Sequence, residues 1–476
     1  MFRMMQKLGQ VFKRLFPLKK DANRSERQKP LDAYYYDSFF KKINNLSYEE
    51  RLEIFGRGSR HNNGYVREEA LQEIKNLKKE DYFPYVIERL NDWVPQVRHL
   101  AQALFLENFQ EISCDQLFKN INLLTIVFRQ KRVDEKLKKR ISARIFELSL
   151  RKNFFDKLKK CSEQQRSFVF QNIFRHKRNN FGAYKEAIID PSRDVRFMAA
   201  RFLSPLTSSP KDLIEKLLED KSAKVRNEMF KNIPLESFNL YKSFFERALF
   251  DDARLVRKRA QRVLKEKGYD VRSVYLEHMP LFQPFSKKIR AYIGFCEVAH
   301  SIDADQLLQL VQHPKKNVRY AAIAALERLT IENREEIFLS CLEDSSSKVR
   351  VLCANIIDRR YVSLLLDRLI ILLHTSPERT KILVIKLLSR RGGLGALRDI
   401  LWSLSTKDKM LHEVAWQCLE SWYHKNAAQL YQIDQDIYRE TLNLFEGLLA
   451  RKTKPPYRLM HIWNDLPALL KAVEPK

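Results

Sequence analysis

The chain has 476 residues, and 87 Lys and Arg against 59 Asp and Glu give a formal net charge of +28. A hydrophobic content of 45% with only 11 Gly and 16 Pro excludes a disordered or collagen-like chain, and long segments with helical periodicity favour an all-α protein. No stretch approaches the roughly 20 uncharged residues of a membrane-spanning helix, and the charge predicts an acidic partner.

Catalytic and metal-binding motifs are missing from the sequence. The six cysteines form no Cys-x-x-Cys pair, and the ten histidines have no zinc-ligand spacing. There is no nucleophile elbow, Walker lysine or nucleotide fingerprint. We therefore expect no metal or cofactor, name no catalytic residue, and place the protein in a reducing compartment, the cytoplasm. A catalytic site assembled from distant residues stays open.

Residues 1–30 are expected to form a basic amphipathic helix and a polar linker. The first twenty residues contain six basic and no acidic side chains, with an apolar stripe at helical spacing from Met1 to Phe16. Met1 to Lys20 could lie on an anionic membrane, peripheral on its inner face. The alternatives are a targeting segment and a helix that caps the first repeat.

Residues 31–189 are predicted to be helical, with degenerate repeats. Val66-Arg67 and Val97-Arg98 are 31 residues apart, and the degenerate sites Leu137-Lys138 and Gln165-Arg166 follow. Residues 101–180 hold 18 Lys and Arg against 8 Asp and Glu. The candidate binding residues in this region are Arg129, Lys131, Arg132, Lys138, Lys139 and Arg140.

Phenylalanines are interleaved with these basic residues, among them Phe128, Phe146 and Phe154. Basic and aromatic side chains together could grip phosphates and stack bases. The other interpretation makes the phenylalanines core and the basic residues a solvated face.

Regular repeats occupy residues 190–425. An Asp stands six residues before the Arg of a Val-Arg pair, and these arginines recur at 196, 226, 257 and 350, with His313 in place of the Asp before Arg319 as a variant. Ile289-Arg290 fills the missing step, and positions 381 and 412 continue the count. This period predicts a solenoid of about twelve helical hairpins. In each second helix the Val and the residues four and eight positions on share the core face.

The Arg of each pair lies at the edge of the core face, where it can reach an Asp of its own or the next unit. A repeated Asp and Arg at constant offset favours a structural ladder over ligand contact. The predicted ladder residues are Asp190, Arg196, Asp220, Arg226, Asp251, Arg257, Asp344 and Arg350. The Asp is also expected to cap the start of the second helix.

A second basic surface is predicted on the second helices. Arg201, Lys231 and Arg262 each stand five residues after a ladder arginine, and Lys258 and Lys265 lie nearby. We expect them to stack, with an ordinary lysine-rich surface as the alternative. Arg390 to Gly395 is expected to be a turn between repeats rather than an anion-binding nest. Residues 426–476, after a tryptophan-rich segment, are expected to form a C-terminal cap.

The segments Asp190-Pro-Ser-Arg-Asp-Val-Arg and His313-Pro-Lys-Lys-Asn-Val-Arg resemble HEAT repeats, in the short form of phycobilisome-lyase-like proteins. The resemblance covers most of 60–425 and implies an α-solenoid whose second helices line a concave surface. Members of this class are protein scaffolds, and some bind nucleic acid or act as lyases or DNA glycosylases. None of their functional residues matches a position here.

The leading hypothesis is a non-catalytic scaffold that binds an acidic macromolecular partner through a basic surface, and a protein is the favoured partner. Nucleic-acid binding, with or without glycosylase chemistry, and a membrane-peripheral adaptor are the alternatives. The sequence gives no oligomeric state.

Overall fold

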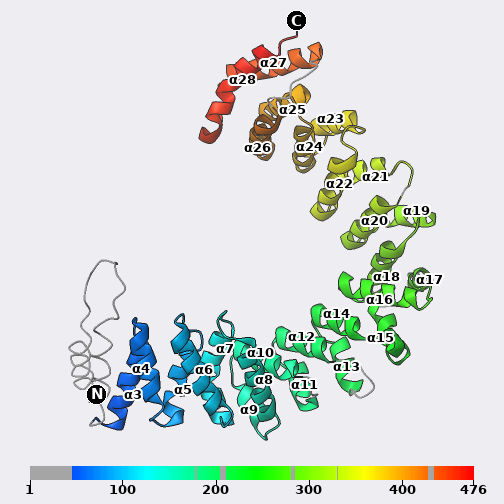
Figure 1. The fold of residues 1–476 in the computed structure, drawn as a ribbon. Coiled ribbons are helices and arrows are strands. Elements are labelled where there is room, and N and C mark those ends of the chain that lie inside the picture. Colours follow the sequence, from blue (N-terminus) through cyan, green and yellow to red (C-terminus); the bar gives the residue numbers. More distant parts are fainter. Residues whose placement is uncertain are drawn as a thin grey trace, which may run out of the picture. The chain divides into compact units, whose positions relative to one another are not determined.

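The computed structural model describes residues 46–176, 180–203, 211–279, 285–329, 331–426 and 434–475, with the backbone alone at Lys79, 285–288 and Asn426. All regular secondary structure in these ranges is helical, and they contain no β-strand (Figure 1). The prediction of an all-α solenoid of helical hairpins is confirmed. The predicted N-terminal helix, Met1 to Lys20, lies outside the described residues.

The chain forms two compact units, Met1–Ile233 and Pro234–Lys476. Unit 1 contains the helices α3 (Tyr48–Gly58), α4 (Gly64–Ile74), α5 (Lys79–Arg89), α6 (Pro95–Phe109), α7 (Cys114–Phe128), α8 (Glu135–Ser149), α9 (Phe154–Lys159), α10 (Glu163–Arg175), α11 (Phe181–Ile188), α12 (Arg193–Phe202), α13 (Lys211–Leu218) and α14 (Ala223–Asn232). The sequence-based division at 30, 189 and 425 followed repeat regularity and stays a prediction.

Unit 2 continues with α15 (Phe238–Ala248), α16 (Arg254–Glu266), α17 (Val271–His278), α18 (Phe285–Val298), α19 (Ala304–Val311), α20 (Lys316–Arg328), α21 (Arg334–Ser340), α22 (Ser347–Arg360), α23 (Leu366–Thr375), α24 (Glu378–Arg390), α25 (Gly393–Ser405), α26 (Lys409–Asn426), α27 (Gln435–Ala450) and α28 (Met460–Ala472). Short 3₁₀ turns precede α15, α19, α22 and α28.

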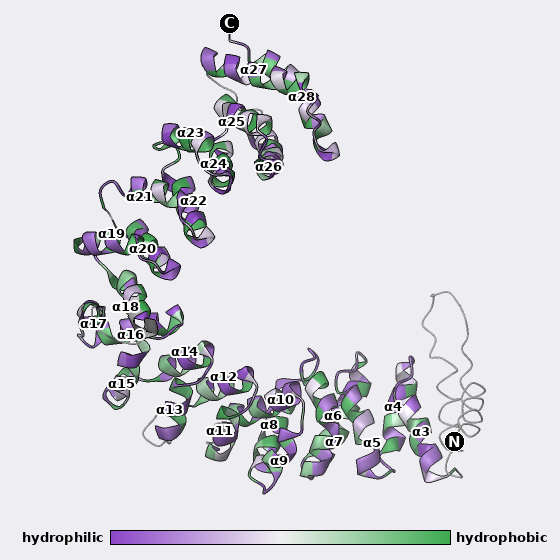
Figure 2. Cartoon of the chain, turned by 180° about the vertical axis from the view of Figure 1, so that it is seen from behind, coloured by the Kyte–Doolittle hydropathy of each residue, from purple (hydrophilic) through white to green (hydrophobic). Residues whose placement is uncertain are grey.

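Pairing the helices in order gives twelve hairpins in the described ranges, from α3/α4 to α25/α26, followed by α27 and α28. Within each unit the even-numbered second helices pack against one another, as α4 does on α6 and α20 on α22. First helices form the other layer, as α5 does with α7. Figure 2 shows hydrophobic and hydrophilic residues on different sides of the helices, as an amphipathic two-layer array requires.

Local sequence signals start several of these helices. Ser47, Ser113 and Ser162 each accept a hydrogen bond from the backbone N–H three residues on, and the side chain of that residue, Glu or Gln, accepts from the serine N–H. This reciprocal capping satisfies donors that a helix start leaves free.

The core face of the second helices is the predicted one. The valines at 195, 225, 256, 318 and 349 have no exposed surface, and neither do the residues four positions on, from Ala199 to Cys353. Because these second helices bury the same face, neighbouring hairpins share one continuous core within unit 1 and within unit 2.

The predicted register of α18 was wrong. Ile289 is half-buried, whereas Ala291, Phe295 and Ala299 are buried with the four- and eight-residue spacing of the other units. Ala291-Tyr292 is therefore the equivalent of Val-Arg, two residues later than the period of 31 indicated. Arg290 instead pairs with Asp252 at 2.5 Å.

Candidate binding surface

Arg196 shows how the predicted ladder residues are connected. Its Nη1 donates to the backbone carbonyl of Asp190, six residues earlier, at 2.8 Å. Its Nε and Nη2 donate to the carboxylate of Asp220 in the next hairpin, at 2.6 and 3.3 Å. Asp220 Oδ1 also accepts from the N–H of Ser222 at 2.7 Å. One arginine thus holds the turn of its own hairpin and binds the next.

The same connection between hairpins recurs through the described residues. Arg67 reaches Asp92, Arg166 reaches Asp190, and Arg319 reaches Asp344, each through two hydrogen bonds. The bond to the carbonyl of the arginine's own turn is also present for Arg98, Arg226 and Arg350.

Arg257 is the variant of this pattern. It keeps the bonds to the carbonyls of Asp251 and Asp252, but its other nitrogens reach Glu297 of α18, at 2.6 and 3.2 Å. Gln261 donates to Glu297 at 2.9 Å and to the hydroxyl of buried Tyr275 at 3.1 Å. A glutamate on the helix here replaces the aspartate in the turn.

The Asp92 carboxylate of the ladder is buried and charged. Asp92 is 5% exposed. Burial alone would raise its pKa, but hydrogen bonds from Arg67 and the Val94 N–H and the nearby arginine charges hold the pKa below its ordinary value.

These geometries make the ladder a structural device. The arginines of the connected pairs are largely enclosed: Arg196 is 4% and Arg257 4% exposed.

The expectation that the Asp caps the second helix was wrong in detail. Its Oδ1 binds the N–H two residues on, as at Ser192 and Ser346, and the helix begins one residue after that position. The Asp shapes the turn instead.

The basic surface of unit 1 gathers around the α7–α8 turn. We define the basic cluster as Arg129, Lys131, Arg132, Lys136, Lys139 and Arg140, all exposed. No ion pair within the described ranges engages any of the six. The nearby Asp134 uses its carboxylate to accept from the Leu137 N–H at 2.6 Å.

Lys138 differs from its neighbours in the predicted set. It is half-buried, pairs with Glu135 at 2.8 Å, and lies over the Phe128 ring at 5.8 Å. It occupies the ladder position of α8, so we assign it to the helix surface contacts rather than to the basic cluster.

Four of the interleaved phenylalanines belong to the core, whereas Phe155 and Phe181 are half-buried. Phe128, Phe146, Phe154 and Phe174 are 9, 5, 0 and 7% exposed. They pack on other rings, as Phe128 does against Phe168 with centroids 5.1 Å apart. The interpretation that these rings stack nucleic-acid bases is therefore wrong, because the faces are already covered.

The predicted second-helix surface is exposed in both units. Arg201 and Lys231 lie on neighbouring α12 and α14 in unit 1, and Lys231 is 3.7 Å from Glu228. Lys258, Arg262 and Lys265 lie on α16 in unit 2, where Arg262 is 3.4 Å from Glu266. The residues belong to two separate units, and their stacking into one ladder stays a prediction.

The turn expected at Arg390 to Gly395 joins α24 to α25. Gly392 and Gly393 have φ of 75° and 69°, in the left-handed region that favours glycine. Arg391 lies 3.6 Å from the buried carboxylate of Asp399. The cation therefore faces an anion of the same chain.

Two absences apply to the described ranges alone. They hold no group of three or more His, Cys, Asp or Glu side chains arranged to bind a metal ion. None of the helices in them is both long and apolar enough to cross a membrane. The six cysteines are free thiols.

Sequence reasoning missed Glu297 as the partner of Arg257. It also missed a row of apolar side chains on the second helices of unit 2, formed by Ile293, Tyr320, Val351 and Ile382. Part of the signal for the row was available, because Tyr320 and Val351 each follow directly after a ladder arginine.

No protein-family model matches the chain, and no curated protein is similar to it in sequence. Solved structures that match this chain include Kap121p bound to the SUMO protease Ulp1p, at 14% identity and a TM-score of 0.39, with the match covering 90% of this chain and 55% of that one. A structure of Kap95p with RanGDP matches at 10% identity and a TM-score of 0.41, and the match covers 98% of this chain and 67% of that one. Importin beta matches at 11% identity and a TM-score of 0.33, and the match covers 94% of this chain and 66% of that one. The chain spans about half the length of Kap121p.

Proposed function

We propose that this protein is a non-catalytic HEAT-like scaffold that binds an acidic protein through the basic cluster of unit 1, in a reducing compartment such as the cytoplasm. The observation that carries the proposal is the exposure of six cationic side chains around the α7–α8 turn with no ion pair among the described residues. Most ladder arginines of the same chain, by contrast, are enclosed and paired.

The charges of the basic cluster are available to a partner. Surface cations without a partner in their own chain attract an acidic surface and raise its rate of association, an effect that salt screens. Lys136 and Arg140 are four residues apart on α8 and therefore share one helix face, beside Lys139. A carboxylate-rich surface or segment laid across α8 would meet all three.

The burial of the phenylalanines favours a protein over single-stranded nucleic acid. Proteins that bind single strands without sequence preference combine a basic groove with exposed aromatic platforms. The basic cluster supplies the charge, but Phe128 and Phe146 are 9 and 5% exposed and covered by neighbouring helices.

Affinity capture from a nuclease-treated lysate at moderate salt tests the proposal. The bait is the full chain, and the variant carries Lys136→Glu, Lys139→Glu and Arg140→Glu. A matched control reverses three exposed lysines scattered over the same unit, Lys75→Glu, Lys119→Glu and Lys185→Glu. We expect a stoichiometric acidic protein that is lost with the first variant and kept with the control.

Three outcomes would contradict the proposal. One is repeated failure to recover any stoichiometric protein. Another is recovery of nucleic acid from untreated lysate with a steep salt dependence and no protein after nuclease treatment. The third is flotation with anionic liposomes in place of protein capture, abolished by deleting Met1 to Lys20.

A further inference from the structure

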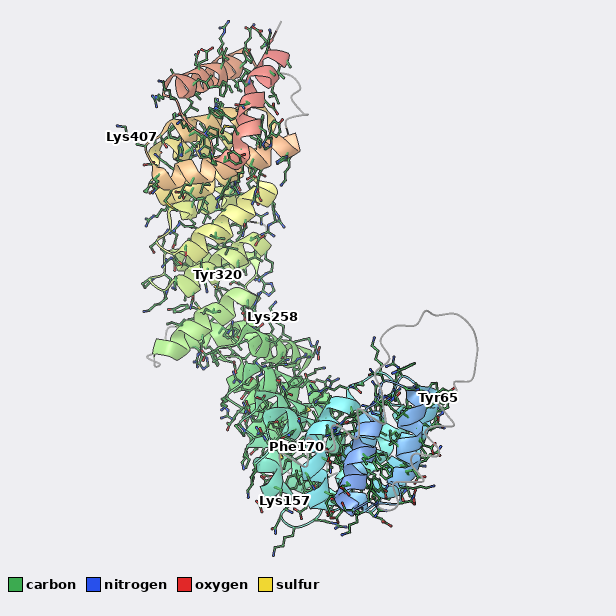
Figure 3. The ribbon with its side chains drawn as sticks, turned by 90° about the vertical axis from the view of Figure 1, so that its left-hand side faces the viewer. Tyr65, Lys157, Phe170, Lys258, Tyr320 and Lys407 are labelled. Carbon is green, nitrogen blue, oxygen red and sulfur yellow. The ribbon has the colours of Figure 1, made fainter. Side chains whose placement is uncertain are left out.

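A row of apolar side chains crosses four neighbouring second helices of unit 2. Its members follow directly after the ladder arginine or the residue in that place: Ile293 on α18, Tyr320 on α20, Val351 on α22 and Ile382 on α24. Tyr320 and Val351 are 43 and 47% exposed, and the two isoleucines are half-buried. We call these four residues the apolar row; Tyr320 is labelled in Figure 3.

The four helices pack in sequence, α18 on α20, α20 on α22, and α22 on α24. Equivalent positions on neighbouring helices therefore lie side by side. Single exposed apolar residues are ordinary on protein surfaces, but four at one register position make a continuous strip.

Cationic and amide side chains flank the apolar row. On one side, two residues before the ladder position, lie Asn317, Lys348 and Arg379. On the other side, four residues after the row position, lie Asn355 and Lys386. All five are exposed, and no ion pair in the described part of the chain engages the three cations.

Acidic side chains of α20 and α22 lie at the helix ends and are already paired. Glu327 binds Arg359 at 2.8 Å, and Asp358 pairs with Arg390. At α22 and α24 the strip is therefore apolar in the middle and positive at its edges, whereas the flanking position of α18 holds Glu297, which pairs with Arg257.

The surface between α20 and α22 is hollowed. Its lining is a mixture of apolar and amide groups: Asn317, Tyr320, Ser347, Lys348, Val351, Leu352 and Asn355. Exposed asparagine amides can both donate to and accept from the backbone of a bound chain.

The spacing between the helices indicates which backbone conformation a bound peptide segment would have. Packed helices lie ~8–10 Å apart. A polyproline II chain advances about 3.1 Å per residue and has three residues per turn, so every third side chain faces the same way at a spacing of ~9 Å. A β-strand repeats its facing side chains every two residues, at ~6.6 Å, which does not match.

We propose that the apolar row docks an extended acidic segment of a partner protein, with an apolar residue at every third position and carboxylates between them. Its apolar side chains would lie between the row residues, and its carboxylates would meet Lys348, Arg379 and Lys386. This inference rests on the proposed function in that the partner is an acidic protein. It places a second, sequence-selective contact in unit 2, separate from the basic cluster.

Fluorescence anisotropy with labelled synthetic peptides tests the inference. The probe repeats the triplet Leu-Asp-Glu. One control has the same composition with the leucines in adjacent blocks, and a second has them at the three- and four-residue spacing of an amphipathic helix. We expect the triplet peptide to bind at least about tenfold more tightly than either control.

Substitutions on the row and beside it locate the contact. Tyr320→Ala, and separately Lys348→Glu with Arg379→Glu, should each weaken binding of the triplet peptide about tenfold or more. Matched controls are Leu255→Ala, at an exposed leucine of α16, and Lys407→Glu, at an exposed lysine between α25 and α26. These should leave the affinity unchanged. The altered side chains are exposed, and an unchanged melting temperature shows that the fold is intact.

Tighter binding of the helix-spaced peptide would overturn the extended occupant. Equal binding of all acidic peptides, or equal loss in the control variants, would overturn the site. The charge reversals in the basic cluster leave the apolar row intact. A chain that captures its partner through the basic cluster but shows no triplet preference refutes this inference alone.

Discussion

The ladder makes a strong prediction about how hairpins are joined, and Asp92→Ala tests it. The carboxylate of Asp92 lies in the turn between α5 and α6 and binds Arg67 of α4 through bonds of 2.8 and 2.9 Å. The two side chains are only 1 and 3% exposed. Removing the carboxylate leaves a buried guanidinium without its counter-charge.

The expected cost follows from that burial. Breaking a buried ion pair by removing one partner destabilises by ~3–5 kcal/mol, because the remaining charge is uncompensated. The matched control is Glu88→Ala. Glu88 of α5 pairs with Arg60 at 2.6 Å, but these side chains are 21 and 52% exposed. An exposed pair contributes about 0.2–1 kcal/mol.

Native-state hydrogen exchange measured by mass spectrometry is the suitable assay, because a repeat array can open locally rather than in one transition. Asp92→Ala should speed exchange of the α3 to α6 amides more than about a hundredfold, as ~3 kcal/mol requires. Exchange in α10 to α12 should change little, since each hairpin contacts only its neighbours. Equal exchange in Asp92→Ala and Glu88→Ala would refute the reasoning.

Other predictions concern the core and acid stability. A Cβ at Gly294 would lie 2.3 Å from the buried Tyr275 ring, so Gly294→Ala should destabilise by ~1–3 kcal/mol in urea denaturation, whereas Gly447→Ala, with open space, should stabilise by up to ~1 kcal/mol. A stable Gly294→Ala would contradict this packing. For Asp344, burial is outweighed by hydrogen bonds from Arg319 and the Ser346 N–H, which lower the pKa. Its stabilisation is therefore complete above the unfolded pKa of about 3.9 and is lost as pH falls through the folded value. Asp344→Asn should melt earlier at neutral pH but lose less stability below about pH 4; an unchanged acid slope would count against the ladder.

The sequence could predict the hairpins because their core repeats at fixed spacing. Val195, Val225 and their equivalents occupy the buried position in every regular unit. The position of the arginine beside the core could also be read from the helical turn.

Other parts depended on packing that no periodicity encodes. Counting by 31 placed Ile289-Arg290 in register, whereas burial of Ala291 and Phe295 required a shift of two residues. The small Ala291 carries a weaker hydrophobic signal than a valine, so the count outweighed it. Glu297 takes the place of the turn aspartate as the partner of Arg257, because the Arg257 side chain reaches helix α18. The spacing of residues in the sequence does not reveal that contact.

The candidate surfaces were predicted unevenly. Exposure of Arg129, Lys131 and Arg132 follows from their charge, but the enclosure of Lys138 depends on Glu135 and the Phe128 ring. Base stacking was considered because aromatic and basic residues alternate in sequence. The helices then turn the rings inward and the charges outward.

Titration calorimetry with the captured partner measures whether the basic cluster binds an acidic protein, as we claim. The wild-type chain, the reversal of Lys136, Lys139 and Arg140, and the matched reversal of Lys75, Lys119 and Lys185 are compared at one salt concentration. We predict at least about a hundredfold weaker binding for the first variant and wild-type affinity for the second. Equal affinities in all three, or an equal loss in both variants, would contradict the claim.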